Sequence, residues 1–217
     1  LINKAIIDPS LSINEINKWN YQFQKYIIEA LEINNYKNRV YTTGSIFEKS
    51  KIKNKYLNSK RNLSNYILQT NFNSVRPCHL RFHTLFGIDF PPYNMFLGQI
   101  FTSIKKKSIF QMSDGDQLRQ YHHYDEVSKY LLNIFNDFKS DNKIIEITGK
   151  EWIKLIDLAR SVFDYFDCKN LLKPGKIKSS KEEITDFNDS IINIGDYSFS
   201  PALKKINDYL EHLLNEK

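Results

Sequence analysis

The chain is poor in cysteine, glycine and proline, and it contains no long run of apolar residues. Its two cysteines, Cys78 and Cys168, lie far apart and make a poor disulfide framework, which favours a reducing cytoplasm. No apolar run reaches the ~18 residues that a membrane-spanning helix needs. Residues 1–10 lack the basic start and the long apolar stretch of a signal peptide. We therefore expect a cytoplasmic protein without a membrane partner.

Neither the metal-binding nor the basic residues gather into a clear cluster in the sequence. The five histidines and two cysteines do not form the tight set that a structural metal site needs, so we expect no metal. The net charge is +6, but the basic residues are scattered apart from the run 105–107. Such a run is typical of a solvated helix end, so we expect no nucleic-acid partner. The mild positive charge is compatible with a phosphate-bearing ligand and also with general solubility.

The order of the apolar segments indicates an α/β fold. With 217 residues, of which 41% are hydrophobic, the chain is long enough for one domain or for a domain with a small second lobe. Strand and helix patterns alternate over the first 87 residues, which predicts a parallel sheet with crossover helices. The expected strands are 1–7, 39–44 and 75–82, and the expected helices are 12–33 and 56–71. Later helices are expected at 93–104, 125–138, 151–166 and from 201 onward, with strands at 108–112, 119–122 and 143–148.

A Tyr–Lys pair in the second helix is the clearest candidate for chemistry. Tyr56 and Lys60 are four residues apart, so they share one face of a helix and can meet. An ammonium beside a phenol favours the phenolate, which lowers the phenol's pKa from about 10 and suits it to acid–base catalysis. The preceding strand ends in residues 42–45 (Thr-Thr-Gly-Ser), where a hydroxyl can bond the same substrate oxygen. Among 13 tyrosines, a bare pair of this kind more often reflects a solvent-facing Lys beside a half-buried Tyr, so its context decides.

Several segments give the pair that context. Downstream of it follow a strand end at 81–87, the segment 113–127, an Ile-Thr-Gly turn at 147–149 and Phe-Ser-Pro at 199–201. Together with the Thr-Thr-Gly-Ser strand end and Tyr-x-x-x-Lys, this order resembles the extended short-chain dehydrogenase/reductase family, the NAD-dependent epimerase/dehydratases. The segment 113–127 has the family's Arg as Arg119, but the Asp that usually follows is Gln120. The resemblance covers nearly the whole chain.

The resemblance implies a Rossmann-like parallel sheet with a smaller, mixed C-terminal substrate lobe. Residues 1–87 would form the C-terminal part of the dinucleotide-binding domain, and 88–217 mostly the substrate lobe, with 120–148 returning to the sheet. The family opens with a Gly-rich turn that seats the cofactor pyrophosphate on a helix N-terminus. None of the seven glycines here forms a Gly-x-x-Gly-x-x-Gly pattern. We therefore expect the sheet to be incomplete, with its first three strands missing and the fourth beginning near Leu1.

Carried over position by position, the resemblance also implies roles for single residues. Tyr56 would be the catalytic acid or base, and Lys60 would lower its pKa and bond the nicotinamide ribose of NAD or NADP. Thr43 would take the place of the catalytic, substrate-binding Ser/Thr, with Ser45 as the less favoured candidate. Arg119 would bind the substrate diphosphate, since a guanidinium fork suits phosphate, although a surface ion pair is an equal alternative. The remaining predicted site residues are His83, for the substrate pocket, and Asn3 and Ala5, near the cofactor.

The expected function is NAD(P)-dependent reduction of a 4-keto group on a nucleotide-linked sugar, in surface-polysaccharide synthesis. The short gap between Thr43 and Tyr56 resembles that of deoxysugar-nucleotide 4-ketoreductases, and Gly44-Ser45 replaces the Asp-Glu pair of dehydratases. The alternatives are a nucleotide-sugar 4-epimerase and, from another class, an inactive truncated remnant or a partner-binding subunit. The resemblance also implies a homodimer formed through the helices around Trp19 and 56–71, unless these helices simply face the sheet.

Overall fold

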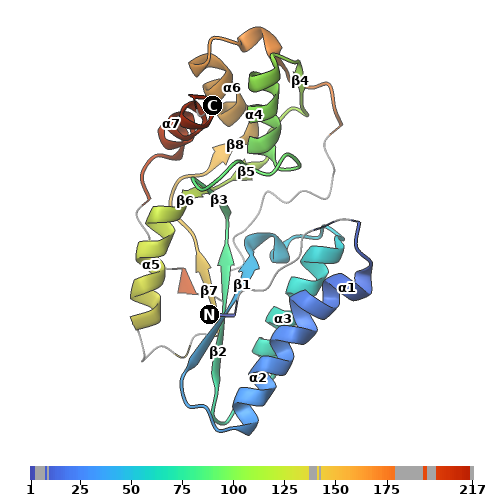
Figure 1. The fold of residues 1–217 in the computed structure, drawn as a ribbon, viewed down its shortest axis with the longest axis vertical. Helices are drawn as coiled ribbons and strands as arrows, with labels where there is room; N and C mark the ends of the chain where they lie inside the picture. Colours follow the sequence, from blue (N-terminus) through green and yellow to red (C-terminus); the bar gives the residue numbers. More distant parts are fainter. Residues whose placement is uncertain are drawn as a thin grey trace. The chain divides into compact units, whose positions relative to one another are not determined.

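The computed structural model describes residues 1–2, 8, 10–136, 141, 143–178, 193–194 and 199–215 (Figure 1). Its contacts divide the chain into two units. Unit 1 comprises the described residues of 1–83, 132–148 and 186–196, and unit 2 those of 84–131, 149–185 and 197–217. The sequence pattern placed the first division after Gly87 and the return to the sheet at residue 120. No helix among the described residues is long and apolar enough to cross a membrane.

Unit 1 is built on a four-stranded parallel sheet. Its strands, in spatial order, are β1 (Arg39–Ser45), β2 (Arg76–Phe82), β7 (Ile144–Ile147) and β10 (Asn193–Ile194). In the β1–β2 register Thr42 lies opposite His79, and Gly44 lies opposite Arg81. Ile2 forms a parallel bridge with Thr42, and the rest of the expected strand 1–7 lies outside the described residues. The parallel sheet expected from the sequence is confirmed.

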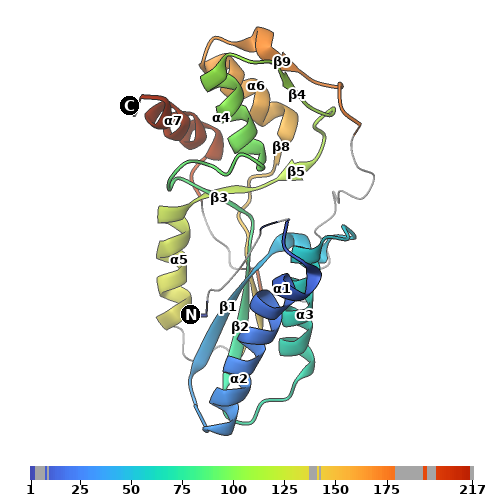
Figure 2. The same ribbon diagram turned by 45° about the vertical axis from the view of Figure 1, so that its right-hand side comes forward.

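Helices cover both faces of this sheet (Figures 1 and 2). A helical run follows the start of the chain as α1 (Ile13–Asn17), a π-helical turn η1 (Lys18–Gln22) and α2 (Phe23–Ile33). The run begins at a capping box, in which Ser12 and Glu15 satisfy each other's backbone amides. It stops at Asn34, and Asn35 takes a left-handed conformation (φ 53°) that asparagine tolerates.

The second helix of unit 1, α3 (Lys55–Gln69), follows β1 after a short 3-10 turn, η2 (Ile46–Lys49). Helices α2 and α3 pack on one face of the sheet around Ile28, Val40, Leu63, Ile67 and Val75, all of them buried. The other face is covered by the end of α5 (Tyr124–Asn136), where the Tyr41 hydroxyl donates to the Ile134 carbonyl at 3.0 Å. Because strand side chains alternate, residues 40, 42 and 44 of β1 face α3, as do 79 and 81 of β2.

Unit 2 has a helical core with small two-stranded sheets. The pairs are β3–β6 and β4–β9, both parallel, and β5–β8, which is antiparallel. Helices α4, α6 and α7 enclose an apolar cluster in which Phe163 stacks on Phe110 at 5.6 Å. The elements are β3 (Thr84–Phe86), α4 (Phe96–Lys106), β4 (Phe110–Gln111), β5 (Leu118–Arg119), β6 (Tyr121–His123), β8 (Ile153–Lys154), α6 (Leu155–Tyr165), the 3-10 turn η3 (Lys169–Leu171), β9 (Leu172–Lys173) and α7 (Ala202–Asn215).

Two helix starts in unit 2 differ from the sequence prediction. The helix expected from residue 93 begins at Phe96, because Met95 first turns back to donate its amide to the Pro92 carbonyl at 2.9 Å. The helix expected from 151 begins at Leu155, because residues 153–154 pair with β5 first. Both shifts are tertiary effects that local periodicity does not contain.

Candidate active site

The Tyr–Lys pair lies in the first turns of α3, as predicted. The helix begins at Asn54, whose side-chain oxygen accepts from the amides of Tyr56 (2.8 Å) and Leu57 (3.3 Å). One turn further on, the Lys60 ammonium lies 5.8 Å from the centre of the Tyr56 ring. Lys60 is only 1% exposed, whereas Tyr56 is partly exposed. The buried ammonium contradicts the alternative of a solvent-facing Lys.

Lys60 joins the helix to the end of β1. Its Nζ donates a hydrogen bond of 2.6 Å to the backbone carbonyl of Thr43. This hydrogen bond and the contact with the Tyr56 ring hold the buried ammonium between the strand end and the helix. Thr43, Tyr56 and Lys60, three of the predicted site residues, therefore come together at the carboxyl end of β1. In parallel α/β sheets this edge is where ligands bind.

The pKa of Tyr56 moves in the opposite direction to the one predicted. Burial, aided by the negative charge of Glu48, raises the pKa of Tyr56 to about 12. Burial also lowers the pKa of Lys60 to about 8, and Glu48 opposes that shift. The prediction of a lowered phenol pKa was wrong because it counted the neighbouring ammonium and omitted desolvation and the carboxylate. At neutral pH the pair is a neutral phenol beside a protonated amine.

Ser45 has a local structural role. Its hydroxyl accepts from the Phe47 amide at 3.3 Å, and its own amide donates to the Glu48 carboxylate at 2.7 Å. This is a capping box for η2. Ser45 and Thr43 are both partly exposed at the strand end, and the Ser45 hydroxyl is engaged in the turn.

A chain of buried charges lies under the pair, and the sequence analysis did not find it. The Glu48 carboxylate is held by His79 Nε2 (3.1 Å) and by Arg81 Nε (3.1 Å). His79 Nδ1 lies 2.7 Å from the Thr42 hydroxyl, and Arg81 Nη1 donates to Glu146 at 3.2 Å. We call this set, with Lys49 on Glu146 (3.4 Å), the charge chain.

The electrostatics of the charge chain keep its central carboxylate ionised. Burial alone would raise the pKa of Glu48, but His79, Arg81 and the Ser45 amide outweigh it and hold the pKa at about 2. Gly44 gives this contact room, because a Cβ there would lie 2.1 Å from both Glu48 Oε1 and His79 Nε2. The Ser45–Glu48 part of this arrangement could have been predicted, because Ser-x-x-Glu at 45–48 is a capping-box pattern.

The remaining predicted residues are dispersed. His83, buried at the end of β2, has Nε2 3.2 Å from the Thr148 hydroxyl. Arg119 belongs to unit 2, and its Nη1 donates to the Leu118 carbonyl at 2.8 Å. Its side chain is buried. Asn3 and Ala5 lie outside the described residues. The described residues contain no group of metal-binding side chains.

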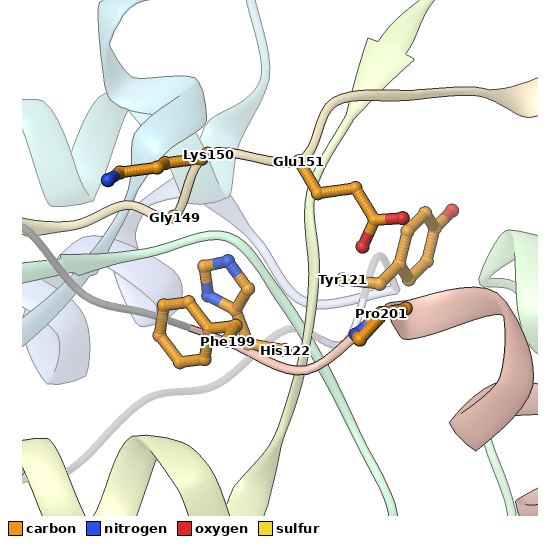
Figure 3. Close-up of a pocket in the computed structure, with 7 residues that line it drawn as sticks. All are labelled: Tyr121, His122, Gly149, Lys150, Glu151, Phe199 and Pro201. Carbon is orange, nitrogen blue, oxygen red and sulfur yellow. The ribbon is translucent and has the colours of Figure 1, made fainter.

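Unit 2 contains a cavity of about 180 Å³ (Figure 3). It is lined by Tyr121, His122, Gly149, Lys150, Glu151, Phe199 and Pro201. The His122 ring stacks on Phe199 with centres 3.9 Å apart and planes within 9°. Burial lowers the pKa of His122 to about 4, so the ring is neutral at pH 7. Sequence analysis gave neither His122 nor Phe199 a role.

Gln120 organises one wall of this cavity. Its side-chain nitrogen donates to the Gly149 carbonyl (2.9 Å), and its oxygen accepts from the Gly149 amide (2.8 Å) and from His122 Nε2 (3.0 Å). An amide can donate and accept at once, whereas a carboxylate only accepts. This explains what Gln offers at a position where the resemblance predicts Asp: it pairs with both backbone groups of Gly149.

The chain matches no protein-family model and no curated protein. Solved structures share its fold. The UDP-glucuronic acid 4-epimerase from Bacillus cereus, solved with UDP-glucuronic acid and NAD, matches with a TM-score of 0.74 at 16% identity, over 97% of this chain and 74% of that chain.

Two further solved structures match over similar lengths. The dTDP-glucose 4,6-dehydratase DesIV from Streptomyces venezuelae, with NAD bound, gives a TM-score of 0.73 at 11% identity, over 97% of this chain and 70% of that chain. RMD from Pseudomonas aeruginosa, complexed with NADPH, gives 0.72 at 11% identity, over 98% of this chain and 80% of that chain. These similarities confirm the Rossmann-like α/β fold that the sequence predicted.

Proposed function

We propose that the chain is a nicotinamide-dependent oxidoreductase that reduces a 4-keto group on a nucleotide-linked sugar. One observation carries the proposal: a neutral phenol, Tyr56, lies beside a buried ammonium, Lys60, at the carboxyl end of β1. A neutral phenol there is a proton donor, and proton donation is what reduction of a ketone requires.

The residues present fit the nicotinamide end of such a cofactor. When bound in its reduced form, NADH or NADPH would supply the hydride for the reaction. Lys60 reaches the strand end as an ammonium that already donates to the Thr43 carbonyl, so it would also meet the hydroxyls of a ribose placed there. Tyr56, one turn earlier on the same helix, would lie on the same side of that ribose.

The chain's own residues would move the proton. Tyr56 would donate its hydroxyl proton to the sugar's keto oxygen as that oxygen becomes an alkoxide. The phenolate left behind would face the Lys60 ammonium, whose positive charge stabilises it. The Thr43 hydroxyl would orient the same oxygen, and we assign Ser45 to the turn rather than to the substrate.

A nucleotide sugar is the proposed substrate class. The solved structures with this fold include complexes whose names specify UDP-glucuronic acid with NAD, and UDP-glucose with NAD. In this chain the Arg119 guanidinium would bind the diphosphate, with its fork on two phosphate oxygens. His83, beside Thr148, would face the sugar. Surface-polysaccharide synthesis, a cytoplasmic location and a homodimer through α1 to α3 stay predictions.

A 4-epimerase is the alternative, and two solved structures with this fold are named as 4-epimerases. An epimerase oxidises and re-reduces one carbon, so Tyr56 would have to act as a base in half of the cycle. Net reduction needs only the proton-donating half of that cycle, which the neutral Tyr56 phenol can perform.

The test is cofactor consumption. The protein is incubated with NADH or NADPH and a dTDP- or UDP-linked 4-keto-6-deoxyhexose, and absorbance at 340 nm is followed. Tyr56→Phe should reduce kcat by about 10²- to 10⁴-fold, the usual contribution of a positioned acid. Tyr66→Phe, on the same helix, is the matched control and should keep kcat near wild type. Interconversion of 4-hydroxy epimers without net cofactor loss would identify the epimerase instead, and equal rates for Tyr56→Phe and wild type would reject both.

A further inference from the structure

The turn between β1 and α3 is built around one acidic residue. Glu48 is 5% exposed, and its carboxylate accepts from the Ser45 amide at 2.7 Å. Its own backbone carbonyl accepts from Arg61 Nε at 2.7 Å. Arg61 belongs to α3 and also donates to the Ile52 carbonyl at 3.0 Å, so one guanidinium ties the whole turn to the helix. Both ends of the turn that leads from Thr43 to Tyr56 are therefore fixed through Glu48 and Arg61.

Charged groups surround Glu48 from every neighbouring element. The ones that face it, directly or through Arg81, come from β2 (His79 and Arg81), η2 (Lys49), α3 (Tyr56, Lys60 and Arg61) and β7 (Glu146). Its nearest partners are cations or hydrogen-bond donors, so Glu48 is ionised. The carboxylate lies against Gly44 and the Ser45 amide, directly after the Thr43 carbonyl that accepts from Lys60, so its negative charge lies near the pair on α3.

We propose that Glu48 is a positioning residue for Tyr56 and Lys60: its carboxylate fixes the turn that places the pair and sets a buried negative charge beside the Lys60 ammonium. The effect of Glu48 on catalysis rests on the proposed oxidoreductase function, whereas its effect on the charge of Lys60 does not. Glu48 itself touches neither member of the pair through a hydrogen bond, and it acts on them through the turn and through its field.

The directions of the two pKa shifts agree with this role. Burial pulls the pKa of Lys60 down to about 8, and Glu48 is the group that pushes it back up. Glu48 also adds to the burial that raises the pKa of Tyr56 to about 12. Without Glu48 both values would fall. Lys60 would then lose its proton nearer to neutral pH, and with it the charge that stabilises the Tyr56 phenolate.

The experiment is an NMR titration of the 217-residue chain with ¹³C-labelled lysine and tyrosine. Lys60→Arg and Tyr56→Phe assign the two signals. In Glu48→Gln, which keeps the shape of the side chain and removes its charge, the pKa of Lys60 should fall by about one unit, and Tyr56 should titrate lower as well. The matched control is Glu146→Gln, which removes another buried carboxylate of the charge chain and should leave the Lys60 pKa at the wild-type value.

Each outcome decides the inference. A Lys60 pKa that is unchanged in Glu48→Gln, or that falls as far in Glu146→Gln, overturns it. If Glu48→Gln does not fold by circular dichroism, Glu48→Asp takes its place: it keeps the charge but draws it back by one methylene, so a smaller fall of the Lys60 pKa supports the inference and no fall overturns it.

The activity readout separates this inference from the proposed function. The alkaline limb of the kcat–pH profile should move to lower pH by the same amount as the Lys60 pKa, with Glu48→Asp between Glu48→Gln and wild type. If the chain reduces no nucleotide sugar, the proposed function fails, while the NMR titration still decides whether Glu48 holds the charge on Lys60.

Discussion

The interiors of the two units are made of different chemistry. Unit 1 buries four charged side chains among its described residues, in and beside its parallel sheet: Glu48, Lys60, Arg81 and Glu146. The described core of unit 2 is an apolar cluster between α4, α6 and α7, with Phe163 and Phe110 stacked near its centre. Its buried polar groups are mostly amides and hydroxyls, with Arg119 as its one buried charged side chain in the described part of the chain.

The apolar core and the buried charges contribute differently to the free energy of unfolding. Burying apolar surface stabilises by roughly 25 cal/mol per Å², whereas a buried ion pair often only offsets the loss of its own hydration. The charge chain of unit 1 is therefore a poor source of stability. Its value would lie in holding Tyr56 and Lys60 in defined charge states, which an apolar core cannot do.

The largest expected effect comes from breaking the charge chain at its centre. Arg81 donates to both Glu48 (3.1 Å) and Glu146 (3.2 Å), so Arg81→Met leaves two buried carboxylates without their shared cation. Removing one partner of a buried pair typically costs about 3–5 kcal/mol in the free energy of unfolding. Urea denaturation at pH 7 measures this loss, and Arg160→Met, at an exposed position, should change it by less than about 0.5 kcal/mol.

Lowering the pH should distinguish the loss of a buried charge in unit 1 from the loss of apolar packing in unit 2. A carboxylate that has lost its cation protonates more easily, so the deficit of Arg81→Met relative to wild type should shrink as the pH falls from 7 to about 4. Phe163→Ala, in the apolar core of unit 2, should cost about 3–5 kcal/mol with no such pH dependence. A deficit of Arg81→Met that stays constant with pH would show that its cost is lost packing.

The next effect is the acid sensitivity of unit 2. Burial lowers the pKa of His122 from 6.5 to about 4, so between these values the unfolded chain binds a proton that the folded chain does not. His122 therefore contributes no penalty above pH 6.5, and the free energy of unfolding falls as the pH drops from 6.5 through 4, by about 3 kcal/mol. His122→Phe should flatten this part of the pH profile, whereas Phe163→Ala, in the apolar core of the same unit, should lower the whole profile and leave its slope unchanged.

Glu48 affects the free energy of unfolding over a lower pH range than His122 does. Its pKa is held at about 2 instead of 4.5, so its stabilising contribution is present above pH 4.5 and is lost as the pH falls from 4.5 toward 2. The loss of stability between pH 6.5 and 4.5 that His122→Phe removes thus reports on His122, and the loss below pH 4.5 that Glu48→Gln removes reports on Glu48. A single loss confined to the lower window would contradict the assignment to His122.

The sequence predicted the elements and the pair well, because both depend on local spacing. Strand–helix alternation predicted the parallel sheet, and Tyr56 and Lys60 share a face because they are four residues apart. The charge chain depends on register: His79 meets Glu48 only because β2 pairs with β1 so that Thr42 lies opposite His79. No local pattern contains that register.

The direction of the Tyr56 pKa shift is a second property that the sequence did not predict. A spacing rule places an ammonium near the phenol, but the sign of the shift depends on how much water both groups lose and on a carboxylate eight residues earlier. Desolvation is a property of the packed interior, so it could not be predicted from Tyr56, Lys60 and their separation alone.

The smallest expected effect tests whether the polar strand end of unit 1 serves structure or substrate. Ser45 caps η2 through a 3.3 Å bond from the Phe47 amide, so Ser45→Ala should lower the free energy of unfolding by about 1 kcal/mol, as for other lost N-caps. It should leave KM for a 4-keto nucleotide sugar nearly unchanged. Thr43→Val, which also removes one hydroxyl, should lower kcat/KM instead, because that hydroxyl would orient the keto oxygen. Urea denaturation and steady-state kinetics on both variants distinguish the roles, and a raised KM in Ser45→Ala would return Ser45 to the substrate site.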